Sequence, residues 1–116
     1  MIEVFEYERE GFCALHSFEG WKLGLINYSD RFSAFRELER HLQTDEAFVL
    51  LEGEATLYTD AQIMSMEIGK IYNIPAGVWH HVVLSREGKV LVVENSNTSK
   101  NNTQKMLVEE NVNADK

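Results

Sequence analysis

The sequence predicts an all-β fold, a barrel or sandwich, in a single domain. Three observations support this class. Seven or eight short stretches have the alternating or β-branched composition of strands. Glycine-containing turns separate several of these stretches. With 116 residues and no internal repeat, the chain is long enough to bury one core without disulfides.

The predicted strands follow one another with short connections. In chain order they are residues 4–7, 21–28, 48–51, 55–58, 63–67, 70–74, 80–84 and 89–95. The third and fourth flank Glu52-Gly53-Glu54, where glycine permits the positive φ of a tight hairpin turn. Pro75 ends the sixth, and a turn containing Gly88 joins the last two. These patterns indicate a strand-rich barrel whose neighbouring strands are antiparallel.

Two further segments are less regular. Residues 33–41 have a weakly helical pattern, but they also alternate, and the surrounding strands favour a strand here. Residues 95–104 are almost all polar and cannot build core, whereas Met106–Val108 can dock as a short edge strand. We therefore expect a barrel domain over residues 1–95 and a polar C-terminal extension over residues 96–116.

Composition excludes some partners. The net charge of −8 disfavours a nucleic-acid partner, because phosphate binding requires a positive surface. The longest apolar runs are far shorter than the roughly 18 residues of a membrane span, so we expect no membrane association. The N-terminus lacks the pattern of a signal peptide, and the single Cys13 cannot form an intrachain disulfide. We expect a cytoplasmic protein whose partner is a small-molecule ligand.

Two groups of polar residues have a distinctive spacing. His41 is followed by four residues, Glu46, six residues and a glycine. Further on, Gly69 is followed by five residues, the turn 75–77, two residues and His80. These spacings resemble the two motifs of the cupin superfamily, in particular those of small single-domain RmlC-like cupins. The resemblance implies a cupin-type double-stranded β-helix, or jelly-roll barrel, which holds a divalent metal.

The resemblance also implies a set of metal ligands. Cupins usually hold the metal with three histidines and one glutamate, and by position these become His41, Glu46 and His80. Glu39 stands where the family has its first histidine. Ser33 and Leu84 also depart from the pattern, replacing a glycine and an asparagine. The implied cofactor is a divalent transition metal, namely Fe, Mn, Ni or Zn.

Strand geometry supports the convergence of these side chains. Residues two apart on a strand share a face, so Glu39 and His41 point the same way. His80 shares its face with Val82, whereas His81 points oppositely, either outward or against a neighbour. Two imidazoles with one or two carboxylates suit a divalent transition metal and leave positions open for a substrate. Glu39 is either a further ligand or a general base.

The function of this site stays open at this stage. Residues 74–95 have a faint similarity to ureidoglycolate lyases, which implies small polar carboxylate or sugar-acid substrates. One hypothesis is a metal-dependent isomerase, lyase or dioxygenase that acts on a sugar, sugar acid or carboxylate. Another is a metal-free module that binds or senses a small molecule through Glu39 and His41. A third is a structural barrel with a filled interior.

The sequence also suggests an oligomeric state. The segment MIEVFEY at residues 1–7 reads as an exposed edge strand, which could pair with a second copy of the chain. We therefore expect a homodimer.

Overall fold

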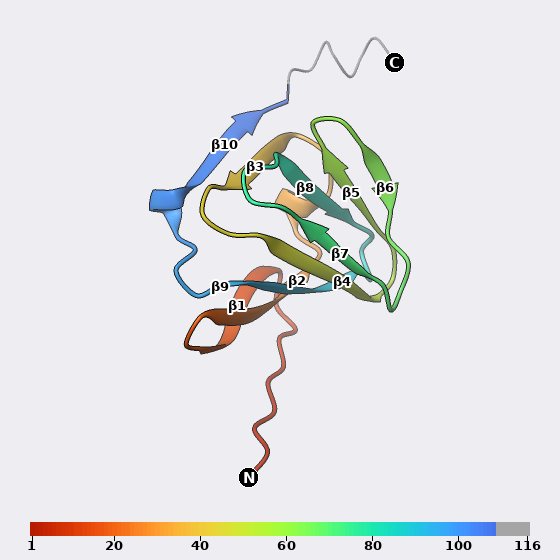
Figure 1. The fold of residues 1–116 in the computed structure, drawn as a ribbon. Helices are drawn as coiled ribbons and strands as arrows, with labels where there is room; N and C mark the ends of the chain where they lie inside the picture. Colours follow the sequence, from red (N-terminus) through yellow and green to blue (C-terminus); the bar gives the residue numbers. More distant parts are fainter. Residues whose placement is uncertain (109–116) are drawn as a thin grey trace.

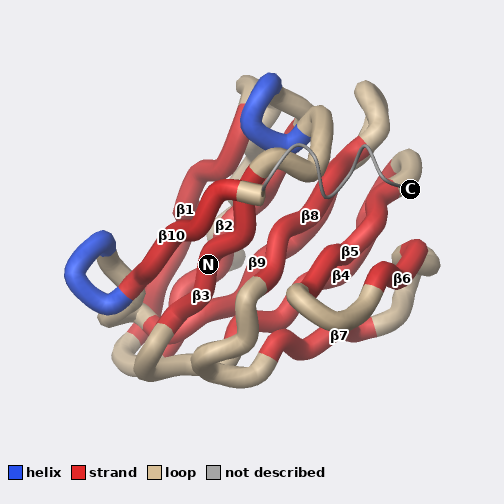
Figure 2. Tube along the Cα trace, turned by 90° about the horizontal axis from the view of Figure 1, so that it is seen from above, coloured by secondary structure: helices blue, strands red, loops and turns tan. Residues whose placement is uncertain are grey.

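The computed structural model describes residues 1–108, which form two antiparallel sheets of five strands each (Figure 1). The strand order is β1-β2-β9-β4-β7 in the first sheet and β10-β3-β8-β5-β6 in the second. Two short 3₁₀ helices, η1 (Asp30–Phe32) and η2 (Lys100–Asn102), lie in connections beyond the strand ends (Figure 2). No helix in this described part is long and apolar enough to cross a bilayer. The predicted all-β class is confirmed.

Most predicted strands occur close to their expected positions. The observed strands are β1 (Gly11–Phe18), β2 (Trp21–Asn27), β3 (Glu37–His41), β4 (Glu46–Glu52), β5 (Ala55–Thr59), β6 (Ile63–Ser65), β7 (Ile71–Ile74), β8 (His80–Leu84), β9 (Lys89–Asn95) and β10 (Thr103–Leu107). The ambiguous segment 33–41 divides into a connection and the strand β3. The C-terminal strand β10 pairs with β3 at the edge of the second sheet.

The predicted strand at residues 4–7 is wrong. These residues form no strand and belong to a segment that extends away from the two sheets (Figure 1). The first strand is instead β1, which pairs with β2. Its register shifts between Ala14 and His16, and such an irregularity breaks the strict alternation that marks a strand in sequence. The expected edge strand at residues 1–7 is therefore absent.

The core lies between the two sheets and follows the alternation of their strands. In the first sheet, Phe48 and Leu50 of β4 pack with Val90 and Val92 of β9. The second sheet contributes Ala55, Leu57, Val82 and Leu84 to the same cluster. Removing this much apolar surface from water is the main source of stability in a domain of this size. On the same inward faces, the positions that follow the apolar residues carry polar side chains.

Strand β2 turns its more apolar face away from the core. Trp21, Leu23 and Leu25 share one face, but only Ile26 of this strand is a buried hydrophobic core residue, and it lies on the face that carries Lys22. Trp21 remains 41% exposed. The inner face of β2 therefore brings a lysine to the interior, and its outer face leaves apolar surface exposed.

The hairpin turn at Gly53 provides a test of the fold. Gly53 has a φ of +68°, and an added Cβ would meet backbone atoms of Glu87 and Gly88 at 2.8 Å. We expect Gly53→Ala to lower the free energy of unfolding by about 1–3 kcal/mol, measured by urea denaturation. Gly69→Ala, at φ +89° with open space around it, is expected to lower the free energy of unfolding by less than Gly53→Ala does. Gly20→Ala meets no atom within 4 Å and serves as the near-neutral control. Equal midpoints for the Gly53 and Gly20 variants would contradict this account.

Candidate metal and ligand site

A cavity of about 670 Å³ opens between the two sheets. Part of its wall is apolar and comes from the core strands, including Phe48, Val82 and Val92. The residues predicted as a site all line it: Glu39, His41, Glu46 and His80. This cavity argues against the third hypothesis, a structural barrel with a filled interior.

The register of the first sheet aligns three charged residues in a row. Lys22 of β2 is paired with Glu94 of β9, and Glu94 is paired with Glu46 of β4. Directly paired residues of an antiparallel ladder present their side chains on the same face. Since Glu46 shares its buried face with Phe48 and Leu50, the whole row faces the interior. The Lys22 Nζ lies 3.5 Å from a carboxylate oxygen of Glu94.

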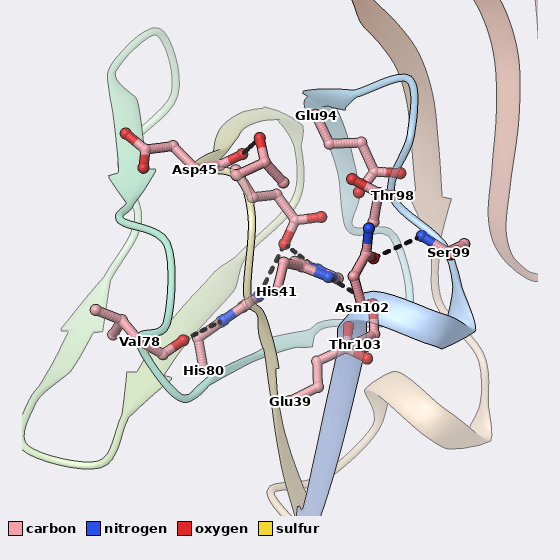
Figure 3. A network of polar contacts seen from close by, with 12 residues as sticks. Glu39, His41, Asp45, Val78, His80, Glu94, Thr98, Ser99, Asn102 and Thr103 are labelled. Atoms are coloured by element: carbon pink, nitrogen blue, oxygen red, sulfur yellow. Dashed lines mark hydrogen bonds and ion pairs between the residues drawn. The ribbon is translucent and has the colours of Figure 1, made fainter.

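The second sheet presents a matching row. Lys105 of β10 is paired with Glu39 of β3, and Glu39 is paired with His80 of β8. Two residues along the ladder, and therefore on the same face, Thr103 of β10 is paired with His41 of β3. Figure 3 shows Glu39, His41, His80 and Thr103 gathered at one end of the barrel, with Glu94 on the opposite side. The two sheets thus contribute polar side chains to one space.

The carboxylate of Glu46 lies between two imidazole rings. Its Oε1 is 3.1 Å from Nε2 of His41 and 2.8 Å from Nε2 of His80. The other ring nitrogens are also held: Nδ1 of His41 lies 2.9 Å from the Thr103 hydroxyl, and Nδ1 of His80 lies 2.9 Å from the carbonyl oxygen of Val78. All three site residues are buried, so both rings have fixed orientations.

The contact between His80 and Glu46 requires a proton or a metal ion between the two atoms. A carbonyl oxygen only accepts hydrogen bonds, so Nδ1 of His80 carries a proton and donates it to Val78. A neutral ring would then turn the lone pair of Nε2 toward a carboxylate oxygen 2.8 Å away. Two acceptors at this distance repel each other unless they share a proton, carried by the ring or by the carboxyl group, or a metal ion.

Burial and mutual contact shift the pKa values of the acidic groups in opposite directions. Burial favours the neutral form of Glu46, but the hydrogen bonds of His41 and His80 outweigh it and hold the pKa of Glu46 below its usual range. For Glu94, burial raises the pKa and the neighbouring Glu46 raises it further, to about 8. Burial lowers the pKa of His41, but the contact with Glu46 more than reverses this, so the pKa is raised. One carboxylate of the pair is therefore charged and the other protonated at neutral pH.

The donor set fits a divalent transition metal. Donor atoms of Glu39, His41 and His80 lie within 4.8 Å of one another, and so do those of His41, Glu46 and Glu94. Imidazole nitrogens with carboxylate oxygens are ligands for Fe, Mn, Ni and Zn. Donors at about 2.0–2.2 Å from one ion lie about 3 Å apart, which is close to the spacing around Glu46.

The carboxylate of Glu39 lies beside the guanidinium group of Arg31. Its Oε2 lies 3.0 Å from Nη2 of Arg31, which comes from η1. The same guanidinium lies 3.5 Å from Glu37 and packs over the ring of Phe32. The ion pair offsets part of the cost of burying the Glu39 carboxylate. It also fixes the position of the carboxylate at the cavity wall.

His81 does not join the metal donors. It is only 3% exposed, its ring stacks on Phe32 with centroids 5.7 Å apart, and its Nε2 lies 3.1 Å from the carbonyl oxygen of Arg31. The prediction that His81 packs against a neighbour agrees with this position, although the residue also borders the cavity.

Sequence reasoning missed three residues of the site. Glu94 continues the buried alternation of Val90 and Val92, and a glutamate in such a position is a signal that could have identified it. Asp45 accepts hydrogen bonds from the backbone nitrogen of Ala76 and the amide of Asn73, so it anchors the turn before His80. Thr103 could not have been found, because its partner His41 lies 62 residues away.

A family model described as a cupin domain matches residues 34–94. This span contains both spaced motifs and ends at Glu94, so Thr103 and Lys105 lie outside it. No curated protein matches the sequence significantly.

Solved structures share the fold at low sequence identity. A cupin-2 domain protein from Shewanella frigidimarina has a TM-score of 0.63 at 22% identity, covering 77% of this chain and 84% of that one. A nucleoside dehydratase from Streptomyces, determined with uridine, has a TM-score of 0.68 at 7% identity, covering 91% and 88%. An RmlC-like protein with a double-stranded β-helix fold, from Methanocaldococcus jannaschii, has a TM-score of 0.61 at 20% identity, covering 82% and 92%. These similarities confirm the predicted double-stranded β-helix and show the fold alone.

The stability of the metal-free chain should fall as the pH rises from 6.5 to 8.5, a range above the pH at which the lowered pKa of the buried His81 has its opposite effect. The pKa of Glu94 rises from 4.5 to about 8 on folding, so its contribution is complete below about pH 4.5 and is lost as the pH rises through 8. The raised pKa of His41 acts in the same direction above pH 6.5. Each group can contribute a slope of up to about 1.4 kcal/mol per pH unit.

Urea denaturation of metal-free protein at several pH values measures this slope. Glu94→Gln carries no titrating carboxyl and is the matched control, for which the decline should be shallower. A wild-type stability that increases over this pH range would contradict the assignment of the protonated carboxyl to Glu94.

Proposed function

The chain belongs to the cupin family, and on that premise we propose that it is a small metal-binding protein that acts on a small polar metabolite in its barrel. The substrate class is a sugar, sugar acid or carboxylate, and the reaction class is isomerase, lyase or dioxygenase. One observation carries the proposal. Nε2 of His80 and Oε1 of Glu46 are held 2.8 Å apart in a buried position, where they need a shared proton or a metal ion. The adjoining cavity provides room for a ligand.

The proposed roles follow from the contacts. His41, Glu46 and His80 would hold the metal, with Glu39 as a further ligand or as the general base. A bound divalent metal would polarise a carbonyl or hydroxyl oxygen of the substrate or activate a water molecule. The hydroxyl of Thr103 and the carbonyl of Val78 orient the two rings through their Nδ1 atoms.

Glu39 is the strongest candidate for moving a proton. Its carboxylate lines the cavity and is positioned by Arg31, so it can reach a bound ligand without leaving its own partner.

A metal-free binding module is the second candidate function. The Arg31–Glu39 ion pair favours it, because Arg31 already compensates the carboxylate that replaces a histidine of the family pattern. A proton shared between His80 and Glu46 would satisfy their contact in the absence of a metal. In this case Glu39 and His41 would hydrogen-bond the ligand, and a metabolite would stabilise the protein without any metal.

We also propose a homodimer, supported by apolar surface on the outside of the first sheet. Phe18 and Trp21 are 59% and 41% exposed, and Phe5 of the N-terminal segment is 47% exposed. The segment before β1 extends away from the sheets and carries the exposed Ile2 and Val4 (Figure 1). A second copy of the chain would cover this surface, because the strand β1 beside it is a sheet edge.

A cytoplasmic location is a further proposal. Its support is Cys13, the single cysteine of the sequence, which is free and suits a reducing compartment.

The metal proposal is tested by elemental analysis after anaerobic reconstitution with Fe, Mn, Ni or Zn. We expect about one metal ion per chain in the wild type, because the two groups of donors share His41. Glu46→Ala and His80→Ala should lower the affinity by at least about 100-fold, since each removes a ligand. His16→Ala is the control, because His16 lies on β1 against Phe5 and Trp21 and should leave the stoichiometry unchanged.

Failure to take up any of the four metals would contradict the metal-dependent function. Thermal stabilisation of that metal-free protein by a metabolite would then support the binding module.

The homodimer is tested by size-exclusion chromatography with light scattering. The wild type should have twice the chain mass, and Phe18→Lys should be monomeric because it places a charge in the proposed interface. Ile71→Lys is the matched control, since Ile71 is 76% exposed on β7 at the other edge of the same sheet. A monomeric wild type at high concentration would exclude this proposal.

A further inference from the structure

A segment outside the family-matched region crosses from one sheet to the other at the cavity. We refer to residues 96–107 as the C-terminal strap. It leaves β9 of the first sheet, passes through η2, and enters the second sheet as β10. Five of its residues, all with hydroxyl or ammonium groups, line the cavity: Thr98, Ser99, Lys100, Thr103 and Lys105. The strap therefore forms part of the site.

Side-chain hydrogen bonds to the backbone hold the strap in place. Ser99 caps η2 by accepting from the backbone nitrogen of Asn101, and the side chain of Asn102 accepts from the backbone nitrogen of Ser99. The side-chain amide of Asn102 also donates to the backbone carbonyl of Asn97 (3.0 Å). The backbone carbonyl of Asn102 accepts a hydrogen bond from the backbone nitrogen of Leu42. This bonding explains why the segment is polar and yet ordered. It presents its remaining side chains in defined positions.

Cations are concentrated around the cavity. Four of the eleven lysine and arginine residues of the chain line it, whereas only three of the nineteen acidic residues do. The four cations are Lys22, Arg31, Lys100 and Lys105. In a chain with a net charge of −8, this is a local reversal of sign. Within residues 1–108, neither Lys100 nor Lys105 forms a salt bridge, so both ammonium groups are available to a ligand.

Two buried polar atoms at this cavity lack a hydrogen-bond partner. They are Nε of Arg31 and Oγ1 of Thr98, and no other buried side-chain nitrogen or oxygen of residues 1–108 is in this condition. The Arg31 Nε lies 3.5 Å from the Glu37 carboxylate, which is too long for a good hydrogen bond. Buried polar groups are nearly always satisfied, and both exceptions here belong to residues that line one cavity. Both atoms are covered by protein, but the residues that carry them border the cavity.

We propose that the mouth of the cavity binds the carboxylate group of a small organic acid, through Arg31 and Lys22 of the barrel and Lys100 and Lys105 of the strap. The proposal rests on the cavity being the ligand site of the proposed function, and it narrows the ligand to an anion. Arg31 contributes the guanidinium N–H groups that its contact with Glu39 leaves over, and Lys22 has a third N–H beyond its contacts with Glu94 and Thr98.

The pairing of charges at the cavity favours an anionic ligand. The cavity is lined by four cations and by the carboxyl groups of Glu39, Glu46 and Glu94. Arg31 lies beside Glu39 and Lys22 beside Glu94, which leaves Lys100 and Lys105 without an acidic partner within residues 1–108. The carboxylates of a small organic acid would pair with these two ammonium groups.

The test compares L-malate with butane-1,2,4-triol, which has hydroxymethyl groups in place of the two carboxylates. Binding to the metal-free full-length chain is measured by isothermal titration calorimetry at constant ionic strength. We expect saturable binding of malate, and binding of the triol at least about tenfold weaker, since charge-assisted contacts are absent. The affinity for malate should fall as salt is added.

The double variant Lys100→Gln and Lys105→Gln tests the strap directly. Both residues are exposed, so the fold should be retained, and malate binding should weaken about three- to tenfold. Lys70→Gln is the matched control, because Lys70 is also exposed but pairs with Glu67 away from the cavity. Its affinity for malate should equal that of the wild type.

Several outcomes would overturn the carboxylate site. They are the absence of saturable malate binding, equal affinity for malate and the triol, and an unchanged affinity in the double lysine variant. Tighter binding of inorganic phosphate than of malate would overturn the assignment to a carboxylate. Because the chain is metal-free in this assay, a failure here leaves the metal stoichiometry unaffected, and a failure to bind metal leaves this result unaffected.

Discussion

The buried carboxylate of Glu46 is the constraint around which the site is organised. A charged group removed from water is strongly unfavourable unless nearby groups compensate it. Here the compensation comes from the opposite sheet, because Glu46 lies on β4 of the first sheet and His41 and His80 lie on β3 and β8 of the second. The contacts therefore cross the barrel interior. They are satisfied only when the three strands have the correct register.

Other features support this arrangement from a distance. The turn at residues 75–77 precedes β8 and so positions His80. Asp45 accepts a hydrogen bond from the backbone nitrogen of Ala76 in this turn, and the carbonyl of His41 accepts one from the backbone nitrogen of Gly77. Glu94 occupies the ladder position opposite Glu46, where two charged carboxylates would repel each other. Its raised pKa is the physical response to that position. The contacts around Glu46 therefore depend on one another, because each fixes the position or the charge of its neighbour.

The fold and the principal donors could be predicted because they depend on local patterns. Alternation and glycine turns locate most strands from Trp21 onward, and the spacing of His41, Glu46 and His80 identifies a family arrangement. The prediction fails where local pattern and structure disagree. A register shift obscures β1, and the apolar face of β2 points outward because the interior requires Lys22 beside Glu94. Thr103 and the Arg31 guanidinium reach the site only through tertiary structure, so no spacing marks them.

The C-terminal strap has a consequence for how such a protein can change during evolution. Its backbone is held by its own asparagine and serine side chains, and within the described chain none of its residues belongs to the buried core cluster. Substitutions at its cavity-facing positions therefore alter the ligand environment with little effect on folding. A barrel that keeps its inner donors could acquire a new ligand preference by replacing this one peripheral segment. Ligand specificity could then change through the strap, while selection for stability acts on the residues of the core.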